Sequence, residues 1–400
     1  MSLNDTVSAE RIHISFFGRR NAGKSSLVNA FTGQELSVVS DVPGTTTDPV
    51  KKAMELLPLG PVLITDTAGF DDEGAIGEKR VEKTLQTLRS TDIAVLVIDS
   101  QLGKSDTDDE LIKLFEDKNI PYITVYNKSD LIPGKAHEGE NEIFVSAESG
   151  ENVNALKEKI GALCKKSEPK YIIADKLSRG DTVILVIPID ESAPKGRLIL
   201  PQQQTLRELL DFHCKVICVQ PSELRETIGG LTEKPKVVIT DSQAFGKVSE
   251  DVPCDIFLTS FSILFARYKG ELAELIKGAS ALTKLKDGDK VLISEGCTHH
   301  RQCGDIGTVK MPAWIEKFTG KKPLYFFTCG TEFPQKLSEY SYSLIVHCGG
   351  CMLNEAEMKS RINAAKDSGV PIVNYGMAIA LMHGILDRAL EIFPEVKELL

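Results

Sequence analysis

A segment near the amino end has the residue types and spacing of a phosphate-binding loop. Residues 18–25 read GRRNAGKS and match the pattern GxxxxGK[ST], between the apolar run ISFF and the helix-forming run SSLVNAFTG. In that setting backbone N–H groups and the amino end of the helix surround phosphate oxygens. Lys24 then reaches the β and γ oxygens, and the Ser25 hydroxyl binds magnesium. The segment therefore predicts a site for a nucleoside triphosphate with Mg²⁺.

A second motif, DTAG at 66–69, follows the apolar run PVLIT. An acidic side chain at the end of that strand can hold magnesium through water, which is the role we expect of Asp66. The backbone N–H of Gly69 can meet the γ-phosphate.

Two further motifs predict that the base is guanine. NKSD at 127–130 follows PYITVY, where the Asp130 carboxylate can accept hydrogen bonds from guanine N1–H and its exocyclic amine. Adenine would leave that carboxylate unpaired. SAESG at 146–150 follows IFV and resembles the loop that supports guanine through a backbone N–H. Four motifs in this order, each at a strand end, predict a GTP- and GDP-binding GTPase.

The residues that these motifs predict to contact the nucleotide are Gly18, Asn21, Ala22, Gly23, Lys24, Ser25, Ser26, Asp66, Gly69, Asn127, Lys128, Asp130, Ser146 and Ala147.

The motif set resembles the translation-factor class of small GTPases, and most closely the group that contains Era and TrmE. The segment GTTTD at 44–48 matches the GTTRD-like switch I of that group. The resemblance implies that Thr46 senses and binds magnesium, with Thr45 and Thr47 as alternatives. It also implies that Asn21 is a potassium ligand, although Asn21 could instead serve only to accommodate a tight turn. The catalytic residues on this basis are Asn21, Lys24, Thr46, Asp66 and Gly69.

Position 70 departs from the Ras-like pattern. Ras-like enzymes place a water-orienting glutamine directly after the DxxG glycine, whereas this chain has Phe70 there. We therefore expect slow intrinsic hydrolysis that depends on other groups.

A second set of chemically active residues lies near the carboxyl end. It consists of CTH at 297–299 and HCGGC at 347–351, each directly after an apolar strand-like run. Thiolates are soft ligands suited to zinc or iron–sulfur clusters, and CxxC spacing lets two sulfurs converge on one centre. A CxxC alone could be a redox pair. Both fragments together favour a metal site.

The pattern CxH…HCxxC behind a GTPase domain resembles the HydF family, the maturation GTPases of iron–iron hydrogenases, as does GRLILPQQQ at 196–204. The resemblance implies that Cys297, Cys348 and Cys351 hold a 4Fe–4S cluster. The fourth iron would take an exchangeable ligand, for which His299 and His347 are candidates. Cys303, six residues after Cys297, could compete as the fourth ligand or form a disulfide in air. It further implies a homodimer whose partners are apo iron–iron hydrogenase and the radical-SAM maturases.

Apolar runs of strand length alternate with helical stretches along the whole chain. This rhythm predicts an α/β protein, with a P-loop GTPase domain followed by two smaller α/β domains. A polar stretch, CKKSEPKY, separates the first domain from the rest. We expect a GTPase domain at 1–168, a dimerisation domain at 169–268 and a cluster-binding domain at 269–400.

Composition excludes several classes of protein. The chain has 400 residues, whereas single hydrophobic cores stop growing near about 250–300 residues. We therefore expect two or three domains. A net charge of −10 argues against a general nucleic-acid or anionic-membrane surface. The first residues lack the layout of a signal peptide, and no apolar run is long enough to span a membrane. We therefore expect a cytoplasmic protein whose cysteines are reduced or bind metal.

The sequence thus predicts a GTP-hydrolysing scaffold that binds a 4Fe–4S cluster and delivers a two-iron subcluster precursor to apo iron–iron hydrogenase. The alternative is an Era- or TrmE-like GTPase of RNA modification or ribosome assembly with a structural zinc site. A GTP-gated cysteine redox enzyme is a third hypothesis. It rests on the CxxC spacing alone.

Overall fold

A computed structural model describes most of the chain, which folds into two compact units, Met1–Ser167 and Glu168–Leu400. The described residues are 8–33, 50–70, 83–132, 139–163, 170–189, 196, 198–296, 305–330, 332–334 and 336–400. None of the helices in these ranges combines the length and the hydrophobicity needed to cross a bilayer.

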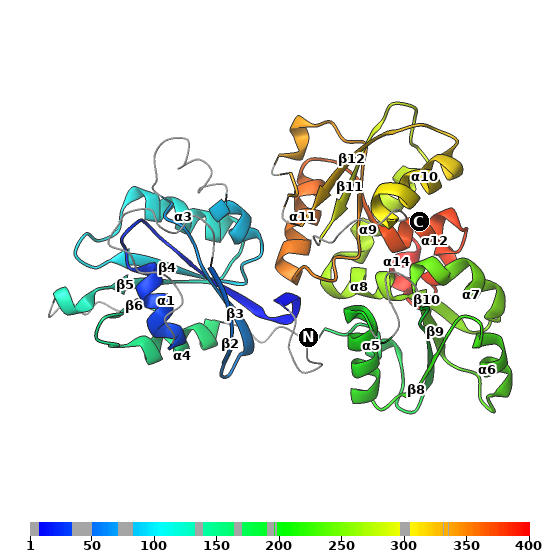
Figure 1. The fold of residues 1–400 in the computed structure, drawn as a ribbon, viewed down its shortest axis with the longest axis horizontal. Helices are drawn as coiled ribbons and strands as arrows, with labels where there is room; N and C mark the ends of the chain where they lie inside the picture. Colours follow the sequence, from blue (N-terminus) through cyan, green and yellow to red (C-terminus); the bar gives the residue numbers. More distant parts are fainter. Residues whose placement is uncertain are drawn as a thin grey trace. The chain divides into compact units, whose positions relative to one another are not determined.

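The first unit is built on a six-stranded sheet of order β2-β3-β1-β4-β5-β6 (Figure 1). Its strands are β1 (Ile12–Phe17), β2 (Val50–Leu56), β3 (Gly60–Asp66), β4 (Ile93–Asp99), β5 (Tyr122–Asn127) and β6 (Glu142–Phe144). All neighbours are parallel except β2, which pairs antiparallel with β3. Every residue of β4 is buried, as expected of a central strand covered on both faces.

Helices cover both faces of this sheet. α1 (Lys24–Thr32) and α4 (Val153–Leu163) pack on one face, over a core that includes Phe16 and Phe31. α3 (Asp106–Asp117) and the helical residues 83–89 pack on the other face, over Phe17. Because successive strand residues point to opposite faces, the pair at 16 and 17 supplies both cores.

The second unit contains two four-stranded parallel sheets. The first consists of β7 (Thr182–Val186), β8 (Lys215–Val219), β9 (Val237–Thr240) and β10 (Phe257–Ser260), in the order β10-β9-β7-β8. The second consists of β11 (Lys290–Glu295), β12 (Leu324–Cys329), β13 (Leu344–His347) and β14 (Ile372–Asn374), in the order β12-β11-β13-β14. The predicted α/β class, with further α/β domains behind a P-loop domain, is therefore confirmed.

The two sheets of the second unit share one continuous hydrophobic core. Their helices are α5 (Leu200–Asp211), α6 (Leu224–Gly230), α7 (Phe245–Asp251), α8 (Phe261–Lys269), α9 (Leu272–Leu282), α10 (Met311–Thr319), α11 (Glu355–Asp367), α12 (Tyr375–Met382), α13 (Leu386–Ala389) and α14 (Pro394–Lys397). α13 contacts β10, and α12 contacts α8 and α9, so helices late in the chain help to cover the earlier sheet (Figure 1).

Candidate functional site

The predicted phosphate loop connects β1 to α1. Gly23 has φ 85°, and a Cβ there would lie 2.2 Å from Asn127 Nδ2, so only glycine fits. Lys24 Nζ, which is buried, donates to Gly18 O at 3.0 Å and to Arg19 O at 2.7 Å. The ammonium group therefore lies inside the loop, where the pattern places the β- and γ-phosphates.

The predicted magnesium ligands meet because β1 and β3 are parallel neighbours. Ser25 follows β1 at the start of α1, Asp66 ends β3, and Ser25 Oγ donates to Asp66 Oδ2 at 2.6 Å. A hydroxyl and a carboxylate are the hard oxygen ligands that Mg²⁺ prefers, so these residues fit the ion. The predicted switch I residue Thr46, with its alternatives Thr45 and Thr47, lies outside the described residues.

Asn127 joins the phosphate loop to the predicted guanine loop. Its Nδ2 donates to Ala22 O at 3.1 Å and to Gly23 O at 3.3 Å, and its Oδ1 accepts from Ala147 N at 3.1 Å. The carboxyl ends of β1, β5 and β6 thus form one site, in which Asp130 is exposed. Exposure leaves this carboxylate accessible to a base.

Lys128 is held by a residue that sequence analysis missed. Its φ is 64°, and its Nζ makes an ion pair with Asp99 Oδ2 at 2.6 Å. Burial alone would raise the pKa of Asp99, but the hydrogen bond and charge of Lys128 leave that pKa below its usual value. Asp99 ends β4, which lies beside β5, and the sequence alone does not show that adjacency.

Phe70 and Asn21, two further positions singled out in the sequence, lie in apolar and in solvent-exposed surroundings respectively. Phe70 packs against the apolar cluster around Phe17 and Phe115, so its ring serves the core and cannot orient a water. Asn21 is exposed, with φ 60°, at the turn that precedes Gly23. Asparagine tolerates that conformation, and its amide oxygen is a ligand that a cation accepts.

The second predicted site lies at the carboxyl end of β13. Cys348 Sγ accepts hydrogen bonds from Gly296 N at 3.0 Å and from Gly350 N at 3.4 Å. Gly350 has φ 61°, a left-handed conformation that lets the chain turn around the sulfur. Burial raises the pKa of the Cys348 thiol to about 11, although both N–H groups oppose that rise. Metal binding displaces such a proton.

Cys297 and His299 lie outside the described residues, as do Cys303 and Cys164. Cys297 is nevertheless the residue after Gly296, whose N–H bonds to Cys348 Sγ. Within the described ranges, no three His, Cys, Asp or Glu side chains gather as metal ligands. Sulfur that accepts backbone N–H groups is the donor chemistry of iron–sulfur clusters, so the described part of this site fits such a group.

His347 is buried, and both of its ring nitrogens have partners. Nδ1 bonds to Cys348 O at 2.7 Å, and Nε2 lies 3.1 Å from Arg361 Nη1. Burial, with the Arg361 charge, lowers the pKa of His347 to about 3, so the ring is neutral. As Arg361 can only donate, Nε2 is the acceptor and Nδ1–H the donor. Ligation of iron by His347 would require one of these bonds to break.

Two buried cations that sequence analysis missed hold the loop that carries Cys348 and Cys351, which we call the cysteine loop. Lys269 Nζ, from the last turn of α8, donates to Cys351 O at 3.1 Å and Leu353 O at 2.9 Å. Arg361, from α11, donates to Gly330 O at 2.6 Å and pairs with Glu357 at 2.8 Å. A cation within an amphipathic helix normally predicts a solvated face, so the sequence gives no signal for either role.

Cysteines outside the two motifs are more often core residues than ligands, so the remaining described cysteines are expected in the core. Cys214 is buried, but Cys218 and Cys254 are exposed and Cys329 is partly exposed. The core expectation is therefore wrong for Cys218 and Cys254. The reason is local, because β8 lies at the edge of its sheet and has no fully buried residue, and Cys254 precedes β10 in a loop.

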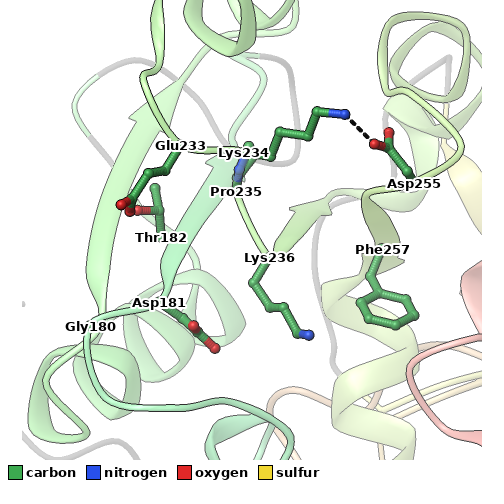
Figure 2. A pocket seen from close by; sticks show the side chains of 9 residues that line it. All are labelled: Gly180, Asp181, Thr182, Glu233, Lys234, Pro235, Lys236, Asp255 and Phe257. Carbon is green, nitrogen blue, oxygen red and sulfur yellow. Dashed lines mark hydrogen bonds and ion pairs between the residues drawn. The ribbon is translucent and has the colours of Figure 1, made fainter.

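A small cavity of about 280 Å³ lies at the amino ends of β7, β9 and β10 (Figure 2). Lys234 pairs with Asp255 at its rim, and the Lys236 ammonium lies 5.4 Å from the centroid of the Phe257 ring. Parallel α/β sheets bind ligands at the carboxyl ends of their strands, which is the opposite edge. The cavity therefore belongs to neither predicted site.

Four protein-family models match the chain, two of them GTPase models over its amino-terminal part. Residues 13–128 match the 50S ribosome-binding GTPase family, and 78–219 match the elongation factor Tu GTP-binding domain. Residues 172–270 match the hydrogen maturase F dimerization domain, and 273–392 match the hydrogen maturase F tetramerization domain. The last two models together cover more than half of the chain.

Curated relatives match the amino-terminal part. GTPase Der of Kosmotoga olearia is 33% identical over 192 residues, which are 42% of this chain and 43% of the relative. GTPase Der of Wolinella succinogenes is 38% identical over 165 residues, 37% of this chain and 35% of the relative. The tRNA modification GTPase MnmE of Nitrosomonas europaea is 33% identical over 153 residues, which are 37% of this chain and 34% of the relative. The chain thus spans less than half the length of these relatives.

Among solved structures, Aquifex aeolicus Era bound to GDP and aluminium fluoride gives an alignment that covers 52% of this chain and 92% of the Era chain. Its TM-score is 0.36 at 22% identity, too remote to support an argument. The family matches and the GTPase relatives establish the activity of the amino-terminal part as GTP hydrolysis. With two hydrogen maturase F domains following that GTPase domain, the chain belongs to the hydrogen maturase F family, HydF.

Proposed function

We propose that this GTPase is a scaffold that holds a 4Fe–4S cluster and delivers the two-iron subcluster precursor to apo iron–iron hydrogenase. The cluster would be held by Cys297, Cys348 and Cys351, and the two-iron precursor is the cargo. When bound, the cluster supplies an iron whose fourth ligand can be exchanged.

The observation that carries this proposal is the arrangement around Cys348. Two backbone N–H groups, from Gly296 and Gly350, point to its sulfur. Such bonds stabilise a thiolate in place of the solvent that burial removes. The loop that carries Cys348 and Cys351 is fixed through its carbonyls by His347 and Lys269, so the N–H of Gly350 within it remains turned toward the sulfur. This is the arrangement expected of a preformed ligand loop.

The nucleotide unit supplies the switch in this proposal. Ser25 and Asp66, with Thr46, would bind magnesium, and Asn21 would bind potassium beside the β- and γ-phosphates. A cation there neutralises charge that develops as the γ-phosphate leaves. Exchange between the GTP and GDP states would alter the affinity for partners, because a ligand shifts an equilibrium only through its differential affinity for two states.

The proposed partners are apo hydrogenase and the radical-SAM maturases, together with a second copy of the chain. We propose that residues 169–268 dimerise and that 269–400 hold the cluster. The matched models support this division, since they describe dimerization and tetramerization domains of hydrogen maturase F. A net charge of −10 does not favour nucleic acid as the partner.

Anaerobic reconstitution with iron and sulfide tests the cluster assignment. Wild type should bind about four irons and four sulfides per chain and give an EPR signal after reduction. Cys348→Ser should lose most of the iron and the signal. Cys254→Ser is the matched control, because Cys254 is exposed in the same unit, and it should keep both. Zinc without sulfide in the wild type would favour the structural-zinc alternative, and full iron in Cys348→Ser would contradict the assignment.

A further inference from the structure

The side chain of Arg19, the second residue of the phosphate loop, bonds to a different segment of the first unit. Its Nη2 donates to Gly103 O at 2.8 Å, and its Nε lies 3.2 Å from Asp108 Oδ2. Gly103 lies in the loop between β4 and α3, and Asp108 lies in the first turn of α3. The guanidinium therefore joins the phosphate loop to residues 103–108, a segment that sequence analysis did not connect with the nucleotide site.

The partner carboxylate, that of Asp108, is fully buried. The Asp108 side chain is 0% exposed, whereas that of Arg19 is 22% exposed. Its Oδ2 also accepts hydrogen bonds from Ser105 N at 3.0 Å and from Ser105 Oγ at 2.8 Å, in the capping box that begins α3. Its Oδ1 has no hydrogen-bond partner among the described residues. A buried carboxylate needs a paired cation, and Arg19 supplies it.

The main chain of Arg19 contacts the lysine of the phosphate loop. Its carbonyl accepts from Lys24 Nζ at 2.7 Å and from Ala22 N at 3.4 Å. Lys24 is the cation that the phosphate-loop pattern places against the β- and γ-phosphates. Arg19 thus contacts Lys24 through its carbonyl and Asp108 through its guanidinium. The position of the Lys24 ammonium therefore depends on an anchor in α3.

We propose that Arg19 and Asp108 are positioning residues for GTP hydrolysis, which hold the Arg19 carbonyl where it fixes Lys24 Nζ. A cation stabilises the charge that develops in the transition state most effectively when it is already in place. Binding of GTP also draws on the backbone N–H groups of the loop. Loss of the anchor should therefore lower kcat more than it raises KM. The inference concerns hydrolysis alone and does not rest on cluster binding or delivery.

Steady-state GTP hydrolysis by the full chain tests the proposal with two variants. Arg19→Met keeps an extended side chain but removes the guanidinium, so kcat should fall about tenfold while KM changes less than about threefold. Lys104→Met is the matched control. Lys104 pairs with Asp109 at 2.6 Å on the same loop and helix, but both of these side chains are exposed. This control should hydrolyse GTP as wild type does.

A double substitution shows whether Arg19 acts through Lys24. Adding Arg19→Met to Lys24→Ala should lower the single-turnover rate by less than about twofold, because the group that Arg19 positions is already missing. A purely structural role would lower the rate by the same factor in both backgrounds. Arg19→Lys keeps a cation beside Asp108 and should restore kcat to within about threefold of wild type.

Three results would overturn the positioning role: a wild-type kcat in folded Arg19→Met, an equal fall in Lys104→Met, or an undiminished effect of Arg19→Met in the Lys24→Ala background. Circular dichroism and thermal unfolding show whether each variant is folded. If Arg19→Met fails to fold, Asp108→Asn replaces it, since the amide keeps an oxygen for Ser105 but removes the charge that pairs with Arg19. The same outcomes apply to that variant.

Discussion

Among single residues, Asn127 does the most to assemble the nucleotide site. One amide group bonds the carbonyls of Ala22 and Gly23, which follow β1, and the N–H of Ala147, which follows β6. Its side chain also occupies the space that a Cβ at Gly23 would need. The guanine loop and the phosphate loop are therefore fixed to each other by contacts within the protein.

Asp130 should determine the choice of base. Its exposed carboxylate can accept two hydrogen bonds from guanine, so Asp130→Asn should weaken GTP binding by about 10²-fold or more and improve binding of xanthosine triphosphate. Calorimetry with both nucleotides measures this. Asp117→Asn, an exposed aspartate at the end of α3, is the control and should bind GTP as wild type does. Unchanged GTP affinity in Asp130→Asn would remove the assignment.

Asn21 should make hydrolysis respond to potassium. Phe70, partly buried against the cluster around Phe17, cannot orient water, so under the proposed role a cation near Asn21 would supply added positive charge. Wild type should hydrolyse GTP at least about tenfold faster in potassium than in sodium, and Asn21→Ala should lose that ratio. Asn119→Ala, another exposed asparagine with positive φ, should keep it. Equal wild-type rates in the two salts would contradict the potassium role.

Among the elements, the loop after β13 depends on two helices: α8, which lies far from it in sequence, and α11, which directly follows it. α8 contributes Lys269 and α11 contributes Arg361, and each side chain is buried. Their bonds to carbonyls of the loop and of Gly330 require both helices to pack against this sheet. The ligand loop is thus a product of tertiary packing, and its CxxC spacing alone would not fix it.

Lys269→Met should loosen this loop. The substitution keeps most of the side-chain volume but leaves the carbonyls of Cys351 and Leu353 without the ammonium donor. Two such losses should lower the free energy of unfolding of the second unit by about 2 kcal/mol or more. Urea unfolding followed by Trp314 fluorescence measures it, with Lys277→Met, an exposed lysine on α9, as the control. Equal stability of the two variants would show that Lys269 does not hold the loop.

The strands and helices were largely predictable, because the apolar runs of parallel strands are buried on both faces and stand out from their polar surroundings. The edge strand β2 was missed. Its residues VKKAMEL are mostly exposed or half-buried, so its sequence shows no continuous apolar run. The helical spacing of Leu206, Leu209 and Leu210 predicts α5, but Leu210 is 52% exposed, since the helix turns only a narrow face to the core.

Some residues of the candidate sites could also be predicted from the sequence, and others could not. Lys24, Ser25 and Asp66 could be predicted because each motif is local and sits at a strand end that the fold brings to one edge. The partners Asp99 and Arg361 could not, because they reach their sites from other elements. Arg361 is 14 residues from His347 along the chain, and nothing in a helical sequence marks its guanidinium as buried.

For the whole molecule, the two predicted sites lie in separate compact units. Lys24→Ala should therefore lower GTP hydrolysis by about 10²-fold or more, by removing charge from the transferred phosphate, yet leave iron content and the EPR signal intact. Cys348→Ser should lose the cluster and hydrolyse GTP at nearly the normal rate. Measuring GTP hydrolysis, iron content and the EPR signal of both variants checks this separation. Loss of hydrolysis in a folded Cys348→Ser would show that the sites depend directly on each other.

The most direct test of the scaffold account is activation of apo iron–iron hydrogenase. The chain, isolated anaerobically after coexpression with the radical-SAM maturases, is mixed with apo-hydrogenase, and hydrogen evolution is measured. Wild type and Cys254→Ser should both activate the hydrogenase, because the exposed Cys254 has no place in the cysteine loop. Folded Cys348→Ser should give no hydrogen above background. Activation by Cys348→Ser equal to that of wild type would contradict the account.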